Sequence, residues 1–130
     1  MKYIIGIALL IVLLTLPAQA RDESSEEFTG LELLRGCTAA IKQFDGRAIS
    51  PKENIEMTYW MGFLAGFMDG NILTRLKGEK WPLCLPSTGI ATEQAVRIVH
   101  KYLENHLEGL HQSGRILIFL ALREAFPCKE

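Results

Sequence analysis

The fold depends on one long stretch, residues 50–76, which reads SPKENIEMTYWMGFLAGFMDGNILTRL. It begins with Ser50, Pro51 and Glu53, which are a capping hydroxyl, a proline at the first helical position and a carboxylate three residues after the cap. Together they form a capping box with its preferred proline, which is a strong signal for a helix start. The apolar residues that follow predict that this helix continues to about Leu76.

The middle of this helix, residues 57–68, is apolar almost all round, apart from Thr58. A helix that is apolar on every face is typical of the buried centre of a domain. The charged residues Asp69 and Arg75 follow too soon for a membrane span, which needs roughly 20 apolar residues. We therefore expect a central, buried helix with a salt-linked end.

Three glycines, Gly62, Gly66 and Gly70, recur at every fourth position of the same helix. Each costs about 1 kcal/mol relative to alanine in a helix interior. Their shared stripe therefore predicts that something packs closely against it. Close crossing by a neighbouring helix of the same chain is the favoured interpretation, and a binding groove or a dimer seam are the alternatives.

Three further helices are predicted over residues 30–44, 92–106 and 115–126, because their apolar residues recur at spacings of three and four. Thr92 is the predicted cap of the second, and Pro127 stops the last. No segment alternates with period two. We therefore expect an all-α fold, a compact bundle of about four helices.

The first residues, 1–20, have the layout of a cleavable secretion signal. A positive start is followed by an apolar run over residues 3–16, then by Pro17 and by small residues ending at Ala20. We expect cleavage after Ala20, which would leave residues 21–130 as a single exported helical domain.

Charge and motifs exclude several classes of function. The 14 Lys and Arg residues nearly balance the 15 Asp and Glu residues and do not cluster, so no nucleic-acid footprint is predicted. His100, His106 and His111 lack the four-residue spacing that places two metal ligands on one helix face. No catalytic constellation is recognisable. We therefore expect no metal, no cofactor and no enzymatic activity.

The three cysteines allow one disulfide and leave one thiol. Cys84 lies in a predicted loop and Cys128 follows the last predicted helix, so a bridge between them strains no helix. Cys37 lies on the apolar stripe of the first helix, where a thiol behaves as a small hydrophobic group. We predict the bridge Cys84–Cys128 and a free Cys37.

Several blocks taken together resemble the Rap/Tai family of periplasmic immunity proteins. The blocks, in chain order, are TGLELL at 29–34 leading into Cys37, GFLAGFMDG at 62–70, CLP at 84–86, TEQ at 92–94, VHKYL at 99–103 and ALREAFPC at 121–128. The family usually has a further cysteine at the position that Trp60 occupies here, so the resemblance also implies that Cys37 lacks a partner.

The resemblance implies an all-helical, often dimeric protein of the Gram-negative periplasm. Such proteins bind toxic enzymes delivered by type VI secretion, notably peptidoglycan amidases, and block them. They have no activity and no cofactor of their own. The late cysteine pair of the family matches Cys84 and Cys128.

The predicted function is therefore an inhibitor that covers the active-site cleft of a cognate cell-wall hydrolase. Loops on a rigid helical scaffold commonly carry recognition. The predicted contact residues are Lys80, Trp81, Glu108, His111 and Gln112.

Two alternatives remain open at this point. One is a periplasmic acid-stress chaperone, which would expose apolar surface at low pH. The other is a structural or envelope-assembly subunit that uses the glycine stripe to oligomerise.

Overall fold

A computed structural model describes residues 28–79 and 82–128, so the predicted signal at residues 1–20 lies outside the described residues. The described chain forms four α-helices and one short 3₁₀ turn: α2 (Gly30–Phe44), α3 (Pro51–Leu76), α4 (Thr92–Asn105), η2 (Leu107–Gly109) and α5 (Gly114–Ala125). Within these residues there is no strand, and one isolated bridge joins Thr29 and Ser113. The predicted all-α bundle is confirmed.

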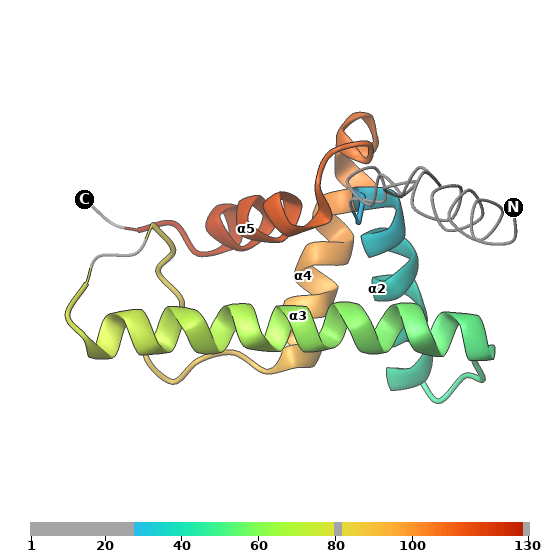
Figure 1. Cartoon of the computed structure of the whole chain (residues 1–130), viewed down its shortest axis with the longest axis horizontal. Helices are drawn as coiled ribbons and strands as arrows, with labels where there is room; N and C mark the ends of the chain where they lie inside the picture. The colour runs from blue at the N-terminus through green and yellow to red at the C-terminus, as the bar shows by residue number, and fades with distance from the viewer. Residues whose placement is uncertain (1–27, 80–81, 129–130) are drawn as a thin grey trace, which may run out of the picture.

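The helices are arranged around α3, which at 26 residues is about 39 Å long and spans the molecule (Figure 1). Helices α2 and α4 pack side by side and cross one half of it. Helix α5 packs on α4 and leads away over the other half.

The start of α3 has the predicted capping box. The Glu53 amide donates to Ser50 Oγ (3.3 Å), and the Ser50 amide donates to Glu53 Oε2 (2.8 Å). Lys42, at the end of α2, donates to Glu53 Oε1 at 2.6 Å. The Lys42 hydrogen bond, helped by Ser50, lowers the pKa of Glu53 to about 2. This cap therefore also ties the end of α2 to the start of α3.

The prediction that α3 is buried on every face was wrong. Its buried residues recur at spacings of three and four and so occupy one face: Met57, Trp60, Leu64, Met68 and Asn71. The opposite face is open, and Ile55, Leu73 and Leu76 on α3 are 71%, 61% and 79% exposed.

The favoured interpretation of the glycine stripe was also wrong. A Cβ atom added to Gly62, Gly66 or Gly70 would meet nothing within 4 Å. No described helix of the same chain crosses closely there. The two alternatives, a groove or a dimer seam, remain.

Close packing instead occurs at glycines on two other helices, both against Trp60. A Cβ added to Gly36 of α2 would lie 2.6 Å from Trp60 Cδ1, and one added to Gly114 of α5 would lie 2.6 Å from Trp60 Cη2. The indole is 3% exposed. The ring therefore packs between α2 and α5, each of which has a glycine at the point of contact.

The end of α3 is held by the loop after it, and neither Asp69 nor Arg75 forms the predicted salt link with any described residue. Asn71 Nδ2 donates to the Leu83 carbonyl (3.1 Å), and Arg75 Nη1 donates to the Leu85 carbonyl (2.9 Å). Leu83 and Leu85 are buried. Asp69 is exposed and takes no part in this contact.

The predicted cysteine pairing is confirmed. Cys84 is bonded to Cys128, which ties the loop after α3 to the end of α5, and Cys37 is free and buried. Burial raises the pKa of the Cys37 thiol to about 12. The predicted boundaries of α4 and α5 shift by one residue: α4 is capped by Ala91 and not by Thr92, α4 ends at Asn105, and α5 covers Gly114–Ala125.

We expect Gly36→Ala to lower the free energy of unfolding by about 1–3 kcal/mol, because the rigid Trp60 ring cannot yield to a methyl group. Gly70→Ala is the matched control. It adds the same methyl group to open space in a helix, so it should raise stability by up to about 1 kcal/mol. Urea unfolding measures both, and equal stability of the two variants would contradict the packing described here.

Removal of the bridge in the double variant Cys84→Ser/Cys128→Ser should lower the free energy of unfolding by about 4 kcal/mol, because the bridge restricts the unfolded chain. Reductant should destabilise the wild type equally and leave the double variant unchanged. A wild type whose stability is unchanged by reductant would rule out this role of the bridge.

Cys37 should resist alkylation at pH 8 until the chain unfolds, because its thiol stays protonated and buried.

Candidate functional site

The most prominent surface feature is a projecting turn, which we call the tip and define as residues 107–112. It contains η2 and the residues that lead into α5. In Figure 1 it rises beyond the ends of α2 and α4.

Backbone hydrogen bonds hold the tip against the start of α2. The Gly30 amide donates to the Gln112 carbonyl (2.8 Å), and the Leu31 amide donates to the Leu110 carbonyl (3.0 Å). The first amides of a helix lack partners within it. The tip therefore supplies acceptors that α2 needs, and α2 fixes the position of the tip.

The segment before α2 completes this attachment. The Gly114 amide donates to the Phe28 carbonyl at 2.8 Å. Thr29 forms a capping box with Glu32, in which the Thr29 amide donates to Glu32 Oε2 at 2.8 Å. The segment 110–114 is thus hydrogen-bonded both to Phe28, before the cap residue Thr29, and to Gly30 and Leu31, after it.

The base of the tip is fixed by His106. Its ring stacks on Tyr102 with centroids 4.1 Å apart, and its Nδ1 lies 2.7 Å from the Tyr102 carbonyl. A carbonyl only accepts, so Nδ1 carries the hydrogen and donates it. Gly109 is buried beneath the turn.

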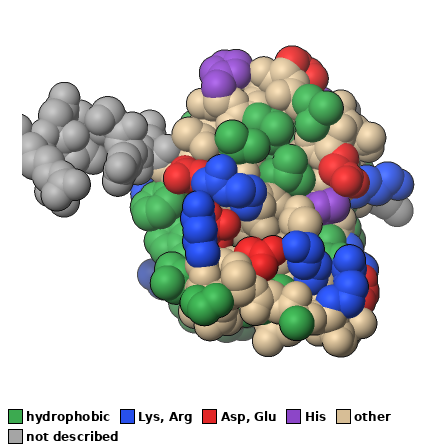
Figure 2. Space-filling view, turned by 90° about the vertical axis from the view of Figure 1, so that its right-hand side faces the viewer, with side chains coloured by type: hydrophobic (Ala, Val, Ile, Leu, Met, Phe, Trp, Pro, Cys, Tyr) green, Lys and Arg blue, Asp and Glu red, His purple; other side chains and the backbone are tan. Residues whose placement is uncertain are grey.

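The side chains that the tip presents are mixed in chemistry. Leu107 is 62% exposed, and Glu108, His111 and Gln112 are exposed polar residues. Leu31, 49% exposed, lies beside the tip through its bond to Leu110. Figure 2 views the end of the molecule that carries α2 and shows apolar side chains next to a histidine at its top, above a charged region.

The structure brings together only part of the predicted contact set. Glu108, His111 and Gln112 share the tip. Lys80 and Trp81 lie outside the described residues. The described segment that begins at residue 82 is bonded through Cys84 to the far end of α5, about 18 Å along that helix from the tip.

Sequence reasoning missed Leu107 and Leu31. A leucine inside the polar stretch 104–112 was a usable signal for Leu107. The sequence did not distinguish Leu31 from the core residues, because it lies on the same helix as several of them.

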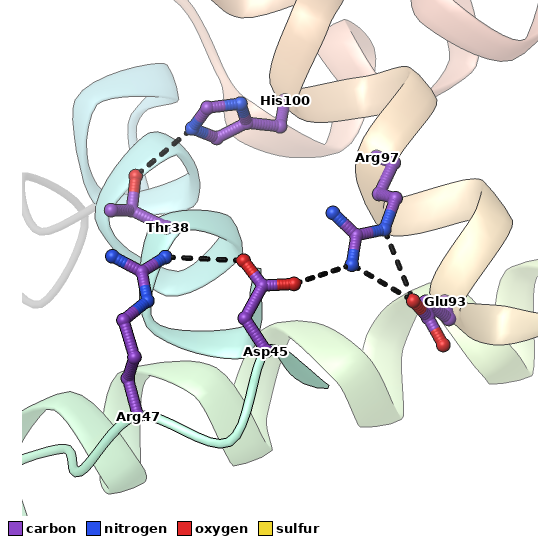
Figure 3. A network of polar contacts seen from close by, with 6 residues as sticks. All are labelled: Thr38, Asp45, Arg47, Glu93, Arg97 and His100. Atoms are coloured by element: carbon purple, nitrogen blue, oxygen red, sulfur yellow. Dashed lines mark hydrogen bonds and ion pairs between the residues drawn. The ribbon is translucent and has the colours of Figure 1, made fainter. Parts of the chain in front are cut away.

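A second polar cluster joins the end of α2 to α4 through hydrogen bonds and ion pairs (Figure 3). Arg97 Nη2 donates to Asp45 Oδ1 and Glu93 Oε1, both at 2.9 Å, and Arg47 Nη2 donates to Asp45 Oδ2 at 3.2 Å. Hydrogen bonding from Arg97, with the charge of Arg47 nearby, lowers the pKa of Asp45. Both oxygens of Asp45 are thus paired, which suits a link between helices better than acid–base chemistry.

His100 of α4 makes a further polar contact with α2, at Thr38. Thr38 Oγ1 donates its only hydrogen to the Leu34 carbonyl at 2.8 Å and lies 3.1 Å from His100 Nε2. The histidine nitrogen is therefore the donor in that second contact. The described residues contain no group of three histidine, cysteine or acidic side chains that could hold a metal ion.

Comparison with known proteins gives the class. The family described as Rap1a immunity proteins matches residues 29–128, from Thr29 in the α2 cap beside the tip to Cys128 in the disulfide. This chain belongs to the family of Rap1a immunity proteins. No curated protein and no solved structure matches the chain. Among the described residues, no helix is both long enough and apolar enough to cross a membrane.

We expect Gly30→Ala to displace the tip, because its added methyl group would overlap the Leu117 side chain of α5 and lie 3.0 Å from the Leu110 backbone Cα. The free energy of unfolding should fall by about 1–3 kcal/mol. The Leu31 amide should also exchange its hydrogen faster. Leu31→Ala, on the exposed neighbour, should change stability by no more than about 0.5 kcal/mol. Unchanged exchange at Leu31 in the Gly30 variant would contradict this attachment.

Proposed function

We propose that this protein is an exported immunity protein that binds a toxic enzyme delivered by type VI secretion. In this proposal the tip enters the active-site cleft of that enzyme and excludes its substrate. Membership in a family of immunity proteins supports binding to an effector. The single structural observation that carries the mode of inhibition is the projecting tip, bonded through its backbone to α2.

The physical reason for effective inhibition is pre-organisation. A loop that is already ordered loses less conformational entropy when it binds. Leu107 offers an apolar anchor, and Glu108, His111 and Gln112 offer hydrogen-bonding and charged groups around it. Such a mixed surface suits the cleft of a hydrolase, which is lined with ionisable groups. Inhibition comes from occupancy and requires no chemistry by this chain.

The proposed compartment supports a proposed class of target. Residues 1–20 have the layout of a cleavable secretion signal, so we propose that residues 21–130 act in the periplasm. Peptidoglycan is the substrate exposed there, and a peptidoglycan amidase is therefore the proposed target. Lys80 and Trp81 are proposed as a second contact region, and the acting form is proposed to be a homodimer.

The first test is capture of partners by the mature domain, residues 21–130, from the secreted and periplasmic fractions of the producing cells. The expected result is a stoichiometric complex with a cell-wall hydrolase that has lost its activity. A hydrolase that is bound but remains fully active would contradict occlusion. Capture of many unrelated proteins, only at acid pH, would favour a chaperone.

The tip itself is tested with the double variant Leu107→Ala/His111→Ala. Loss of contacts at the centre of an interface typically costs at least 1–2 kcal/mol, so we expect the dissociation constant to rise at least about tenfold. Gln94→Ala, an exposed change on α4 outside the tip, is the matched control and should bind like the wild type. Calorimetry on the purified pair measures both, and equal affinities would exclude the tip as the contact.

A further inference from the structure

A groove opens in the angle between α4 and α5. The two helices cross and then diverge toward the end of α5 (Figure 1). Ala121 and Ala125, one turn apart on α5, line the groove together with Ile98 of α4, so part of its lining is apolar. The two methyl groups are too small to fill the angle between the helices, and a hollow of about 260 Å³ is left.

The polar part of the lining lies at the ends of both helices. Asn105 is the last residue of α4, and Glu124 and Ala125 are the last two residues of α5. The C-terminal end of a helix carries a partial negative charge, because its last carbonyl groups lack partners within the helix. Glu124 adds a full charge, since it is exposed and forms no ion pair with any described residue. The groove is therefore negative at this end.

Tyr102, which also lines the groove, shows the effect of this charge. Burial, followed by the charges of Glu124 and Glu108, raises the pKa of the Tyr102 hydroxyl, and Arg123 acts in the opposite direction. The Arg123 guanidinium lies over the Phe119 ring, 5.3 Å from its centroid. Because Glu108 belongs to the tip, the negative potential extends from the groove to the tip.

We propose that this groove receives a basic side chain, arginine or lysine, of the toxic enzyme that the tip inhibits. The inference rests on the proposed function and adds a second contact to it. The aliphatic stem of the basic side chain lies against Ile98, Ala121 and Ala125, and its cationic head reaches the Glu124 carboxylate. Long basic side chains commonly place their stems on apolar surface and their charged heads at its polar edge.

The groove lies at the base of the tip, where a bound enzyme meets it. The Tyr102 ring stacks on His106, and His106 directly precedes Leu107, the first residue of the tip. An enzyme whose cleft holds the tip therefore brings the surface around that cleft against the groove.

Charge complementarity selects the occupant. An acidic side chain would be repelled by Glu124 and by the ends of both helices. An apolar side chain would take Glu124 out of water without a partner, which costs free energy. A basic side chain satisfies the carboxylate, and arginine fits best because its planar guanidinium bonds both carboxylate oxygens at once.

Lys101 lines the same groove with the opposite charge. It is exposed and forms no ion pair with any described residue. Its ammonium group is unfavourable for a second cation in the groove. The proposal therefore requires that removal of the Lys101 charge and removal of the Glu124 charge have opposite effects on binding.

The contribution of the groove is measured by calorimetry with the captured hydrolase. Glu124→Lys should raise the dissociation constant at least about tenfold, because it places a cation against the incoming basic side chain. Lys101→Met should lower the dissociation constant by about twofold to threefold, because it removes the unfavourable charge and keeps an unbranched side chain. Both residues are exposed, so the helical spectrum and the thermal unfolding should stay unchanged.

Asp69→Lys is the matched control for net charge. It makes the same reversal at an exposed position of α3 outside the groove, so it should bind like the wild type. Equal weakening by Asp69→Lys and Glu124→Lys would reveal an effect of net charge and overturn the proposal. A Glu124→Lys variant that binds and inhibits like the wild type would overturn the groove contact alone and leave the proposed function standing. A wild type that captures no such enzyme would contradict both.

A small probe tests the groove without the enzyme. N-acetyl-arginine amide should shift the NMR signals of Asn105, Glu124 and Ala125 in the mature domain and leave the signal of Asp69 unchanged. N-acetyl-citrulline amide has nearly the same shape and no charge, so it should shift none of them. Ala125→Leu, which fills the groove from an exposed position, should abolish the response. Equal shifts from the two probes, or no shift at these residues, would overturn the proposal even if the tip inhibits the enzyme.

Discussion

The arrangement of the helices depends on the packing of one indole, that of Trp60, between Gly36 and Gly114. The ring also meets Phe28 and Phe63 edge to face, at centroid distances of 5.8 and 6.1 Å. It therefore joins α2, α3 and the start of α5 in one contact. Because Gly114 is the first residue of α5, this contact also determines where the preceding turn leaves the bundle. The position of the tip is thus a consequence of core packing.

Local signals in the sequence predicted the elements well. The bounds of α2 agree with the prediction, and Ser50, Pro51 and Glu53 start α3 as expected. These features depend on neighbours in the chain. The burial of α3 was predicted wrongly because apolar residues occupy both of its faces, and a pattern of this kind does not distinguish a buried face from an exposed apolar one. The glycines that pack closely, Gly36 and Gly114, stood apart in the sequence and gave no periodic signal.

The site was predicted in part for the same reason. The polar turn with Glu108, His111 and Gln112 was recognisable from its composition. Its attachment was not, because the bonds from Gly30 and Leu31 join segments far apart in the chain. Prediction of the bridge Cys84–Cys128 succeeded because both cysteines lie outside the helices, where a disulfide can form without straining a helix.

The attachment of the tip has a consequence for how such a protein changes over evolutionary time. Its position is maintained by main-chain amides and carbonyls, which every residue except proline supplies equally. Side chains at 108, 111 and 112 can therefore be exchanged freely while the scaffold beneath them persists. If the tip binds the effector as proposed, a lineage that meets a new toxin can alter the binding surface without first rebuilding the fold that presents it.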